Sequence, residues 1–274
     1  MSFDKDTPAP RIAFIGGGNM ATALIGGLVH SGRTPAEILV VEPFEAQRGK
    51  LLQATGVAAL PAAEARLAAV ATVVWAVKPQ MFAEAVAPCA PFIGGALQVS
   101  VMAGIRSEAL VAASGSVRVV RAMPNTPALI GKGIAGLYAR PEVDAAARAE
   151  VEALFAPTGE SLWVAQEAQL DAVTALSGSG PAYVFYFIEA MMQAGQQMGL
   201  DAEQARRLAQ STFAGAAALA QQSPLPPSEL RAQVTSKGGT TFAAISSLDD
   251  SAVKAAFVKA LHAARDRAEE LGRA

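Results

Sequence analysis

Residues 11–42 read RIAFIGGGNMATALIGGLVHSGRTPAEILVVE, and this stretch decides the fold. It opens with the apolar run Ile12–Ile15, which is typical of a strand buried on both faces. Three glycines follow, then residues 19–31, which favour a helix, and then a second apolar run, Ile38–Val41. Strand, glycine turn, helix and strand in this order predict the start of a parallel α/β sheet.

The glycine turn matches the dinucleotide-binding fingerprint G-x-G-x-x-G/A. Gly16, Gly18 and Ala21 take its three small-residue positions, in the strand–turn–helix context that it requires. Gly16 would allow the tight turn, Gly18 would let the backbone approach a pyrophosphate, and Ala21 would let the helix pack close to the strand. The N–H groups and positive dipole end of the helix would favour the phosphates. The alternative is a glycine-rich turn packed in an ordinary α/β core.

Glu42 ends the second predicted strand, about 20 residues beyond the fingerprint, where an acid can accept a hydrogen bond from a ribose 2′-hydroxyl. A carboxylate there would repel a 2′-phosphate, so it favours NADH slightly over NADPH. Arg48 lies nearby in the sequence, and we expect both cofactors to work. Glu42 could instead be an ordinary exposed turn acid.

Length and composition narrow the class of protein. The 274 residues form one large domain or two, since single cores stop growing near roughly 250–300 residues. The net charge is −2 without a basic block, which gives no indication of nucleic-acid or anionic-membrane binding. No uncharged apolar run is long enough to span a bilayer. His30 and His262 are far apart and no Cys/His spacing exists, so we expect no metal site.

The cysteine content and the first ten residues indicate the compartment. Cys89 is the only cysteine, which excludes an internal disulfide and agrees with a reducing cytosol. Residues 1–10, MSFDKDTPAP, carry acids and prolines where a signal peptide needs an apolar core. We therefore expect a short disordered tail and a cytoplasmic protein.

Strand and helix patterns alternate over residues 11–165, which predicts a Rossmann-type, doubly wound and mostly parallel sheet. Ser107 is expected to cap a short helix after one of the strands. Ligands bind beyond the carboxyl ends of such strands, where the fingerprint, Glu42, residues 76–79, residues 101–103 and Asn125 all fall. Lys78 could reach a cofactor phosphate or be an ordinary solvated lysine. Further strands are expected at residues 72–77, 97–101, 117–121, 134–139 and 161–164, and helices at 44–54 and 142–155.

Residues 166–274 read as a separate all-helical domain. A capping box formed by Asp201 and Gln204 opens a helix that reaches about residue 222, and a last helix starts near residue 250. The segment 183–198 is apolar nearly all round, so a soluble chain must bury it on every side. In so small a domain a second subunit is the natural cover, and we expect a homodimer built by these helices.

The loop TSKGGTTF, residues 235–242, lies between predicted helices. Its two glycines precede a helical segment and expose consecutive N–H groups, which can hold a carboxylate without an arginine. A flexible turn with a capping threonine explains the same residues equally well.

Five stretches resemble the Δ1-pyrroline-5-carboxylate reductases: FIGGGNMA (14–21), AVKPQ (76–80), MPNTP (123–127), LSGSGPAY (176–183) and TSKGGTT (235–241). They occur in the family's order, and the resemblance covers nearly the whole chain after residues 1–10. The resemblance implies reduction of a cyclic imine to L-proline by NAD(P)H, the last step of proline biosynthesis. It also implies an N-terminal Rossmann domain and a C-terminal helical dimerisation domain, often in a ring of five dimers.

The resemblance also assigns roles to residues. Thr241 would bond the ring nitrogen of the substrate and donate or relay a proton to it. Lys237 stands where many family members have proline, which puts the exact geometry of this loop in doubt. The expected substrate contacts are Ser177, which shapes the pocket floor, and Ser236, Gly238, Gly239, Thr240 and Thr241. The expected cofactor contacts are Ile15, Gly16, Gly17, Gly18, Asn19, Met20, Ala21, Glu42, Ala76, Val77, Lys78, Pro79, Met102, Ala103 and Asn125.

Two rival functions stay open. One is a Rossmann reductase with a helical domain that acts on another imine or a hydroxy acid. The other is a dimeric NAD-binding regulator without catalysis, against which Thr241 and the intact GGTT loop argue. Short-chain-dehydrogenase chemistry is disfavoured because no tyrosine has a lysine four residues after it. A P-loop NTPase is excluded because the motif G-x-x-x-x-G-K-[ST] is absent.

Overall fold

The structure is a computed structural model that describes residues 11–273. The described residues form two compact units. Unit 1 comprises residues 11–178 and 264–273, and unit 2 comprises residues 179–263. The expected tail, residues 1–10, lies outside the described residues.

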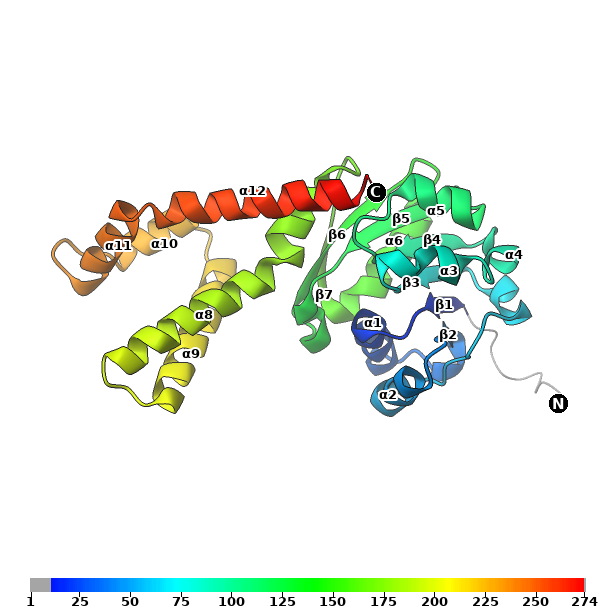
Figure 1. Ribbon diagram of the computed structural model, residues 1–274, viewed down its shortest axis with the longest axis horizontal. Coiled ribbons are helices and arrows are strands. Elements are labelled where there is room, and N and C mark those ends of the chain that lie inside the picture. The colour runs from blue at the N-terminus through cyan, green and yellow to red at the C-terminus, as the bar shows by residue number, and fades with distance from the viewer. Residues whose placement is uncertain (1–10, 274) are drawn as a thin grey trace. The chain divides into compact units, whose positions relative to one another are not determined.

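Unit 1 contains a seven-stranded sheet within residues 11–273 (Figure 1). Its strand order is β2-β1-β3-β4-β5-β6-β7. All neighbouring strands pair in parallel except β5 and β6, which are antiparallel. The strands are β1 (Ile12–Ile15), β2 (Ile38–Val41), β3 (Thr72–Trp75), β4 (Leu97–Ser100), β5 (Val119–Met123), β6 (Gly133–Ala139) and β7 (Gly159–Trp163).

Helices cover both faces of this sheet because successive residues of each central strand point to opposite sides. On β1, Phe14 faces the core built with α1, α2 and α6, whereas Ile15 faces the core built with α3, α4 and α5. The expected doubly wound, mostly parallel sheet is therefore confirmed. The helices of unit 1 are α1 (Asn19–His30), α2 (Glu45–Thr55), α3 (Phe82–Val86), α4 (Ala90–Ile93), α5 (Ser107–Ser114), α6 (Ala145–Phe155) and α7 (Gln169–Val173).

The second of these cores contains one polar pair. The indole N–H of Trp75 donates to Gln98 Oε1 at 2.9 Å, and both side chains are fully buried. Gln98 Nε2 in turn donates to the carbonyls of Ile93 and Ala96. Every polar atom of the pair thus has a partner, which burial requires.

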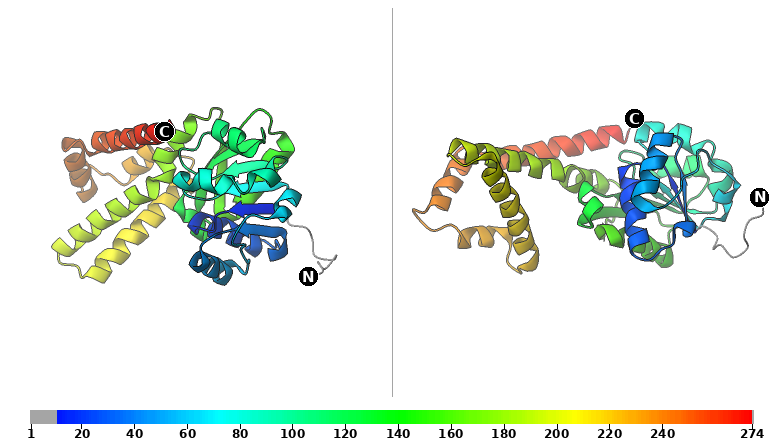
Figure 2. Two further views of the ribbon diagram at one scale, coloured as in Figure 1. Left: turned by 45° about the vertical axis from the view of Figure 1, so that its right-hand side comes forward. Right: turned by 90° about the horizontal axis from the view of Figure 1, so that it is seen from below.

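Unit 2 is all-helical. Within it α8 (Gly180–Gln197) and α9 (Ala202–Gln222) lie side by side (Figures 1 and 2), and they pack closely where Gly195 meets Ala205. The helices that follow are α10 (Pro227–Gln233), α11 (Thr240–Asp250) and α12 (Val253–Leu271), whose last turns from residue 264 belong to unit 1. No helix among the described residues is both long and apolar enough to cross a membrane.

Two local expectations had different outcomes. The capping box is confirmed, since the Asp201 carboxylate accepts from Gln204 N at 2.8 Å and the Gln204 side chain accepts from Asp201 N at 3.1 Å. The expectation that Ser107 caps α5 is wrong. Ser107 is the first helical residue, and its hydroxyl donates to Glu167 Oε2 at 2.6 Å instead. A carboxylate distant in sequence therefore replaces the local cap.

Candidate active site

The fingerprint turn follows β1 and packs against the end of β3. Gly16 has a φ of +97°, and a Cβ added there would lie 2.7 Å from the Ala76 carbonyl oxygen. Its N–H donates to the Val41 carbonyl at 2.8 Å, so the turn also touches β2. Only glycine can combine this backbone angle with this approach. The turn therefore lies where β1 meets β2 on one side and β3 on the other, the switch point at which doubly wound sheets bind ligands.

The next small residue leaves space for a ligand. Gly18 is the N-cap of α1, and a Cβ added to it would meet no described atom within 4 Å. The N–H groups in the first turn of α1 have no preceding helical carbonyl to accept from them. That turn contains no acidic residue, so the dipole of the helix stays available to an anion. This arrangement fits the pyrophosphate of a dinucleotide.

The carboxylate of Glu42 is fixed by two backbone hydrogen bonds that the sequence pattern did not predict. Its Oε2 accepts from Gly17 N at 2.8 Å and its Oε1 accepts from Phe44 N at 2.9 Å. The residue is 6% exposed, so it is not an ordinary exposed turn acid. Gln47 adds a bond from its amide to the Gly17 carbonyl at 2.6 Å. A carboxylate can accept more than two hydrogen bonds, so capacity for a ribose hydroxyl is left.

The remaining expected cofactor residues of unit 1 follow the carboxyl ends of neighbouring strands. Ala76 N donates to the Ile15 carbonyl at 2.8 Å, and Val101 N donates to the Trp75 carbonyl at 3.0 Å, which keeps the ends of β1, β3 and β4 in line. These residues differ in how exposed they are to solvent. Asn19, Lys78 and Pro79 are exposed, Met20, Val77 and Ala103 are half-buried, and Ile15, Ala21 and Met102 are buried in the cores.

The Asn125 side chain makes a hydrogen bond within the protein. Its Oδ1 accepts from Ile134 N at 3.0 Å, which ties the MPNTP turn to β6. This bond uses the amide oxygen, so the NH₂ group of the same side chain keeps its capacity to donate. Sequence reasoning placed Asn125 at the strand edge but not this bond, because it joins residues on different elements.

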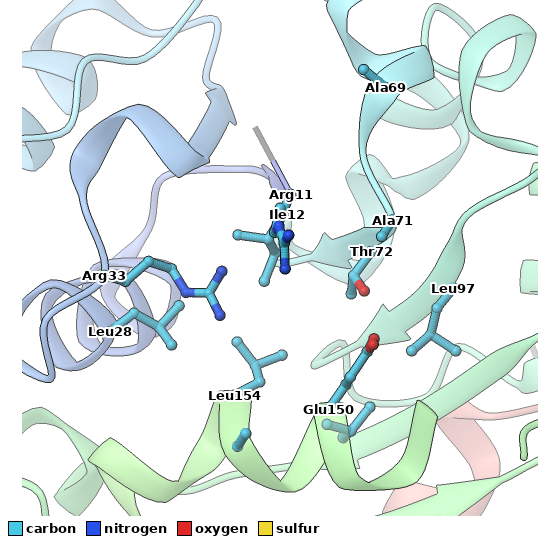
Figure 3. Close-up of a pocket in the computed structure, with 12 residues that line it drawn as sticks. Arg11, Ile12, Leu28, Arg33, Ala69, Ala71, Thr72, Leu97, Glu150 and Leu154 are labelled. Carbon is cyan, nitrogen blue, oxygen red and sulfur yellow. The ribbon is translucent and has the colours of Figure 1, made fainter. Parts of the chain in front are cut away.

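A cavity of about 570 Å³ lies at the amino ends of the strands, opposite to the ends that carry the candidate cofactor site (Figure 3). It is lined by Ile12, Thr72 and Leu97, the first residues of β1, β3 and β4. Arg33 and Glu150 of opposite charge also line it. Because the fingerprint follows the last residue of β1, this cavity is not part of the candidate cofactor site.

Four charged side chains and one serine form a cluster beside α7 that sequence reasoning missed. Glu167 Oε1 accepts from Arg121 Nη1 at 2.9 Å and from Ser107 N at 2.7 Å, and its Oε2 accepts from the Ser107 hydroxyl. Arg106 Nη2 donates to Asp171 Oδ2 at 2.8 Å. Arg121 and Asp171 are each only 4% exposed. No sequence spacing reveals these pairs, because their partners lie 46 to 65 residues apart.

Burial and hydrogen bonding act in opposite directions on the pKa of both members of the central pair. Burial lowers the pKa of the Arg121 guanidinium, and the hydrogen bond to Glu167 opposes this effect. Burial would raise the pKa of the Glu167 carboxyl, but the hydrogen bonds from Ser107 and Arg121 outweigh it and lower that pKa below its ordinary value. The two opposite charges of this hydrogen-bonded pair partly neutralise each other in the interior.

Ser177, the expected substrate residue of unit 1, lies in a π-helical turn, Thr174–Gly178, that directly continues α7. Its hydroxyl donates to the Val173 carbonyl at 3.1 Å, and the residue is half-buried. Single π-helical turns inside helices occur frequently at functional sites.

The other expected substrate residues lie in unit 2. Gly238 has a φ of +78°, and Gly239 is the N-cap of α11 and donates its N–H to the Ser236 carbonyl at 3.0 Å. Thr240 and Thr241 are the first two helical residues, and the first turn contains no acid. The predicted helix start after two glycines is thus confirmed, and its N–H groups can accommodate a carboxylate.

Other chemistry finds little support in the described residues. No group of three or more histidine, cysteine, aspartate or glutamate side chains within residues 11–273 could hold a metal ion. Cys89 is buried, and burial raises the pKa of its thiol to about 11. That thiol is consequently protonated at neutral pH and is a poor nucleophile.

A glycine cradle at the switch point of a doubly wound sheet, followed by an all-helical unit, defines a nicotinamide-dinucleotide oxidoreductase of the Rossmann type. Residues 11–104 match the family model described as NADP oxidoreductase, coenzyme F420-dependent. Residues 167–271 match the model described as pyrroline-5-carboxylate reductase dimerisation.

Individual proteins narrow the class further. The chain is 46% identical to the pyrroline-5-carboxylate reductase of Pseudomonas aeruginosa, over 96% of this chain and 97% of that protein. A structure of the enzyme from Coxiella burnetii is 35% identical, with a TM-score of 0.89, over 96% of this chain and 99% of that chain. A Plasmodium falciparum pyrroline carboxylate reductase with NADP bound is 27% identical, with a TM-score of 0.85, over 96% and 98%. The chain belongs to the pyrroline-5-carboxylate reductase family.

The two fingerprint glycines should respond differently to alanine. Gly18→Ala should change the free energy of unfolding by less than about 1 kcal/mol, since its backbone angles suit alanine. The new methyl group would lie on the open side of the turn, so NADPH binding should weaken about tenfold or more in isothermal titration calorimetry. Gly16→Ala should instead cost about 1–3 kcal/mol of stability, because φ is positive there. Unchanged NADPH affinity in Gly18→Ala would exclude this turn as the phosphate site.

Proposed function

We propose that this chain reduces Δ1-pyrroline-5-carboxylate to L-proline by hydride transfer from NAD(P)H, the last step of proline biosynthesis. The observation that carries the proposal is the 46% identity to the Pseudomonas aeruginosa reductase over 96% of the chain. The turn at Gly16–Ala21 supports it independently, because the open space at Gly18 and a helix start without a capping side chain suit a dinucleotide.

In this proposal unit 1 holds the cofactor, which supplies a hydride when bound. The turn at residues 16–21 binds the pyrophosphate and Glu42 accepts from the adenosine ribose. Residues 76–79, Met102 and Ala103 line the cofactor, and Asn125 stands near the nicotinamide. Their common position at the carboxyl ends of β1 to β5 supports this assignment.

The substrate carboxylate is assigned to the N-terminus of α11. Ser236, Gly238, Gly239 and Thr240 surround a helix start without an acid or a capping side chain, which favours an anion. Ser177 shapes the floor of the pocket from its π-helical turn. Lys237 is exposed beside the loop and adds a positive charge where many family members have proline.

The chemistry demands little acid catalysis from the protein. A protonated imine is strongly electrophilic at C5, so hydride transfer needs no histidine. Thr241 donates to or relays a proton at the ring nitrogen. Catalysis is then mainly positioning, which can contribute roughly 7–11 kcal/mol to lowering the barrier.

We also propose that the protein is a homodimer joined by its C-terminal helices, and that five such dimers can assemble into a decamer. The dimerisation description of the matched family supports oligomer formation. In the single chain one side of α8 packs internally, with Phe187 and Phe257 ring centroids 5.5 Å apart. Elsewhere on this helix, Phe185 is 58% exposed and Tyr186 is 69% exposed. Exposed aromatic residues clustered on one helix favour a subunit partner.

Two further assignments belong to this proposal. The domain boundary at about residue 166 is supported by the start of the dimerisation match at residue 167, whereas the compact units divide after residue 178. The protein is cytoplasmic, which is supported by its single, reduced and buried cysteine.

Thr241→Ala tests the proposed catalytic role. The variant should lose at least about tenfold in kcat/KM for pyrroline-5-carboxylate, because the ring nitrogen loses its hydrogen-bond partner. NADH oxidation at 340 nm gives the rate. Thr235→Ala is the matched control, since its hydroxyl already donates to the Arg231 carbonyl, and it should stay within about twofold. A Thr241→Ala value within about twofold of wild type would remove the assigned role, and no turnover by wild type would remove the proposed function.

Glu42 should favour NADH slightly, because its fixed carboxylate would repel a 2′-phosphate. Glu42→Gln removes the charge and should raise the kcat/KM ratio of NADPH to NADH by roughly fivefold. Glu45→Gln, an exposed acid in the first turn of α2, should leave the ratio unchanged. Equal KM values for both cofactors in wild type would mean that Glu42 does not discriminate.

Analytical ultracentrifugation tests the interface. Wild type should sediment as a dimer or larger, and Phe185→Asp should shift mass toward the monomer because it places a charge in the apolar contact. Leu52→Asp, at a half-exposed apolar residue of α2, should keep the wild-type mass. A purely monomeric wild type would contradict the dimer.

A further inference from the structure

The π-helical turn that carries Ser177 rests on β5 at its far end. A Cβ added to Gly178 would lie 2.5 Å from Met123 Cε, the flexible end of this side chain, so the turn packs closely against Met123. Met123 is the last residue of β5 and directly precedes the turn that contains Asn125. One strand end therefore contacts the expected substrate segment and leads into an expected cofactor residue.

The same strand holds the near end of this segment through charge. Arg121, two residues before Met123, donates to Glu167, which lies two residues before the start of α7. Ser107 adds two hydrogen bonds to the same carboxylate, and Asp171 within α7 accepts from Arg106. Charge-assisted hydrogen bonds to a carboxylate are directional. They therefore fix the orientation and position of α7 more closely than apolar contacts would.

The remaining contact comes from β6. A Cβ added to Gly136 would lie 2.7 Å from Val173 Cγ1, so α7 packs directly on the backbone of this strand. Val173 is also the residue whose carbonyl accepts from the Ser177 hydroxyl. The segment from Glu167 to Gly178 is thus fixed at its start by charge, at its middle by β6 and at its end by β5.

We propose that Arg121 and Glu167 are positioning residues: their ion pair holds α7 and its π-helical turn so that Ser177 stays in register with the cofactor residues at the end of β5. This inference rests on the proposed function, because it assigns Ser177 to the substrate. Loss of the pair should therefore affect binding of the imino acid and leave cofactor binding intact.

A comparison of single and double variants separates positioning from stability. Glu167→Ala leaves the Arg121 charge buried without a partner, so its Tm should fall clearly. Arg121→Met combined with Glu167→Met removes both charges and should regain most of that Tm, since apolar residues of similar size often replace a buried ion pair without loss. The double variant should nevertheless show a KM for pyrroline-5-carboxylate at least about fivefold above wild type, with the NADPH Kd within about twofold.

Arg140→Met with Glu142→Met is the matched control. This Arg–Glu pair, with nitrogen and oxygen 3.5 Å apart, is partly exposed on unit 1, and its loss should leave Tm, KM and Kd near wild type. If the double variant of the buried pair fails to fold, the nearly isosteric Glu167→Gln supplies the same KM readout.

The outcomes are distinguishable. Turnover by wild type with an unchanged KM in the folded buried-pair variant would overturn the positioning role alone. An NADPH Kd that rises as much as the KM would also overturn it, because the effect would then not be specific to the substrate segment. No turnover by wild type would overturn the proposed function and this inference with it.

Discussion

The close approach of two backbone segments is the constraint on which the candidate site depends. A side chain at Gly16 would collide with the Ala76 carbonyl, so the turn after β1 can lie against the end of β3 only when that residue is glycine. This contact sets the direction in which α1 leaves the sheet. It also brings the Gly17 N–H within 2.8 Å of Glu42 at the end of β2. Three strand ends thereby become one ligand-binding edge.

Charge is distributed over this edge in a way that suits a dinucleotide. The first turn of α1 offers N–H groups without an acid, whereas the Glu42 carboxylate is fixed on the β2 side. An anion is therefore favoured at the helix and a hydroxyl at Glu42. The loop before α11 provides the same arrangement, a helix start without an acid in its first turn, with Gly239 as the N-cap. Both ligands would thus be held largely by backbone groups, which explains why so few charged side chains are needed.

Local rules predicted the fold and the glycine turn of the candidate cofactor site, and they failed where distant residues compete. The fingerprint turn and the Asp201–Gln204 capping box depend on neighbours a few residues apart, so spacing alone reveals them. Ser107 looked like a cap by the same logic, but Glu167, 60 residues away, takes its hydroxyl. The bonds that fix Glu42 to Gly17 and Asn125 to β6 were unpredictable for the same reason. The sequence specifies such contacts only through the completed fold.

The buried pair of Arg121 and Glu167 raises the question of what two charges do in a protein interior. Desolvation of both ions offsets most of their attraction, so a buried ion pair is weak support for stability. Arg121 even keeps a buried Nε without a partner among the described residues, which a purely stabilising arrangement would avoid. Unlike an apolar contact, the pair fixes the orientation of the segment, since each hydrogen bond to Glu167 tolerates little rotation. Under the proposed role of Ser177, the segment that carries its hydroxyl benefits from a fixed orientation more than from added stability.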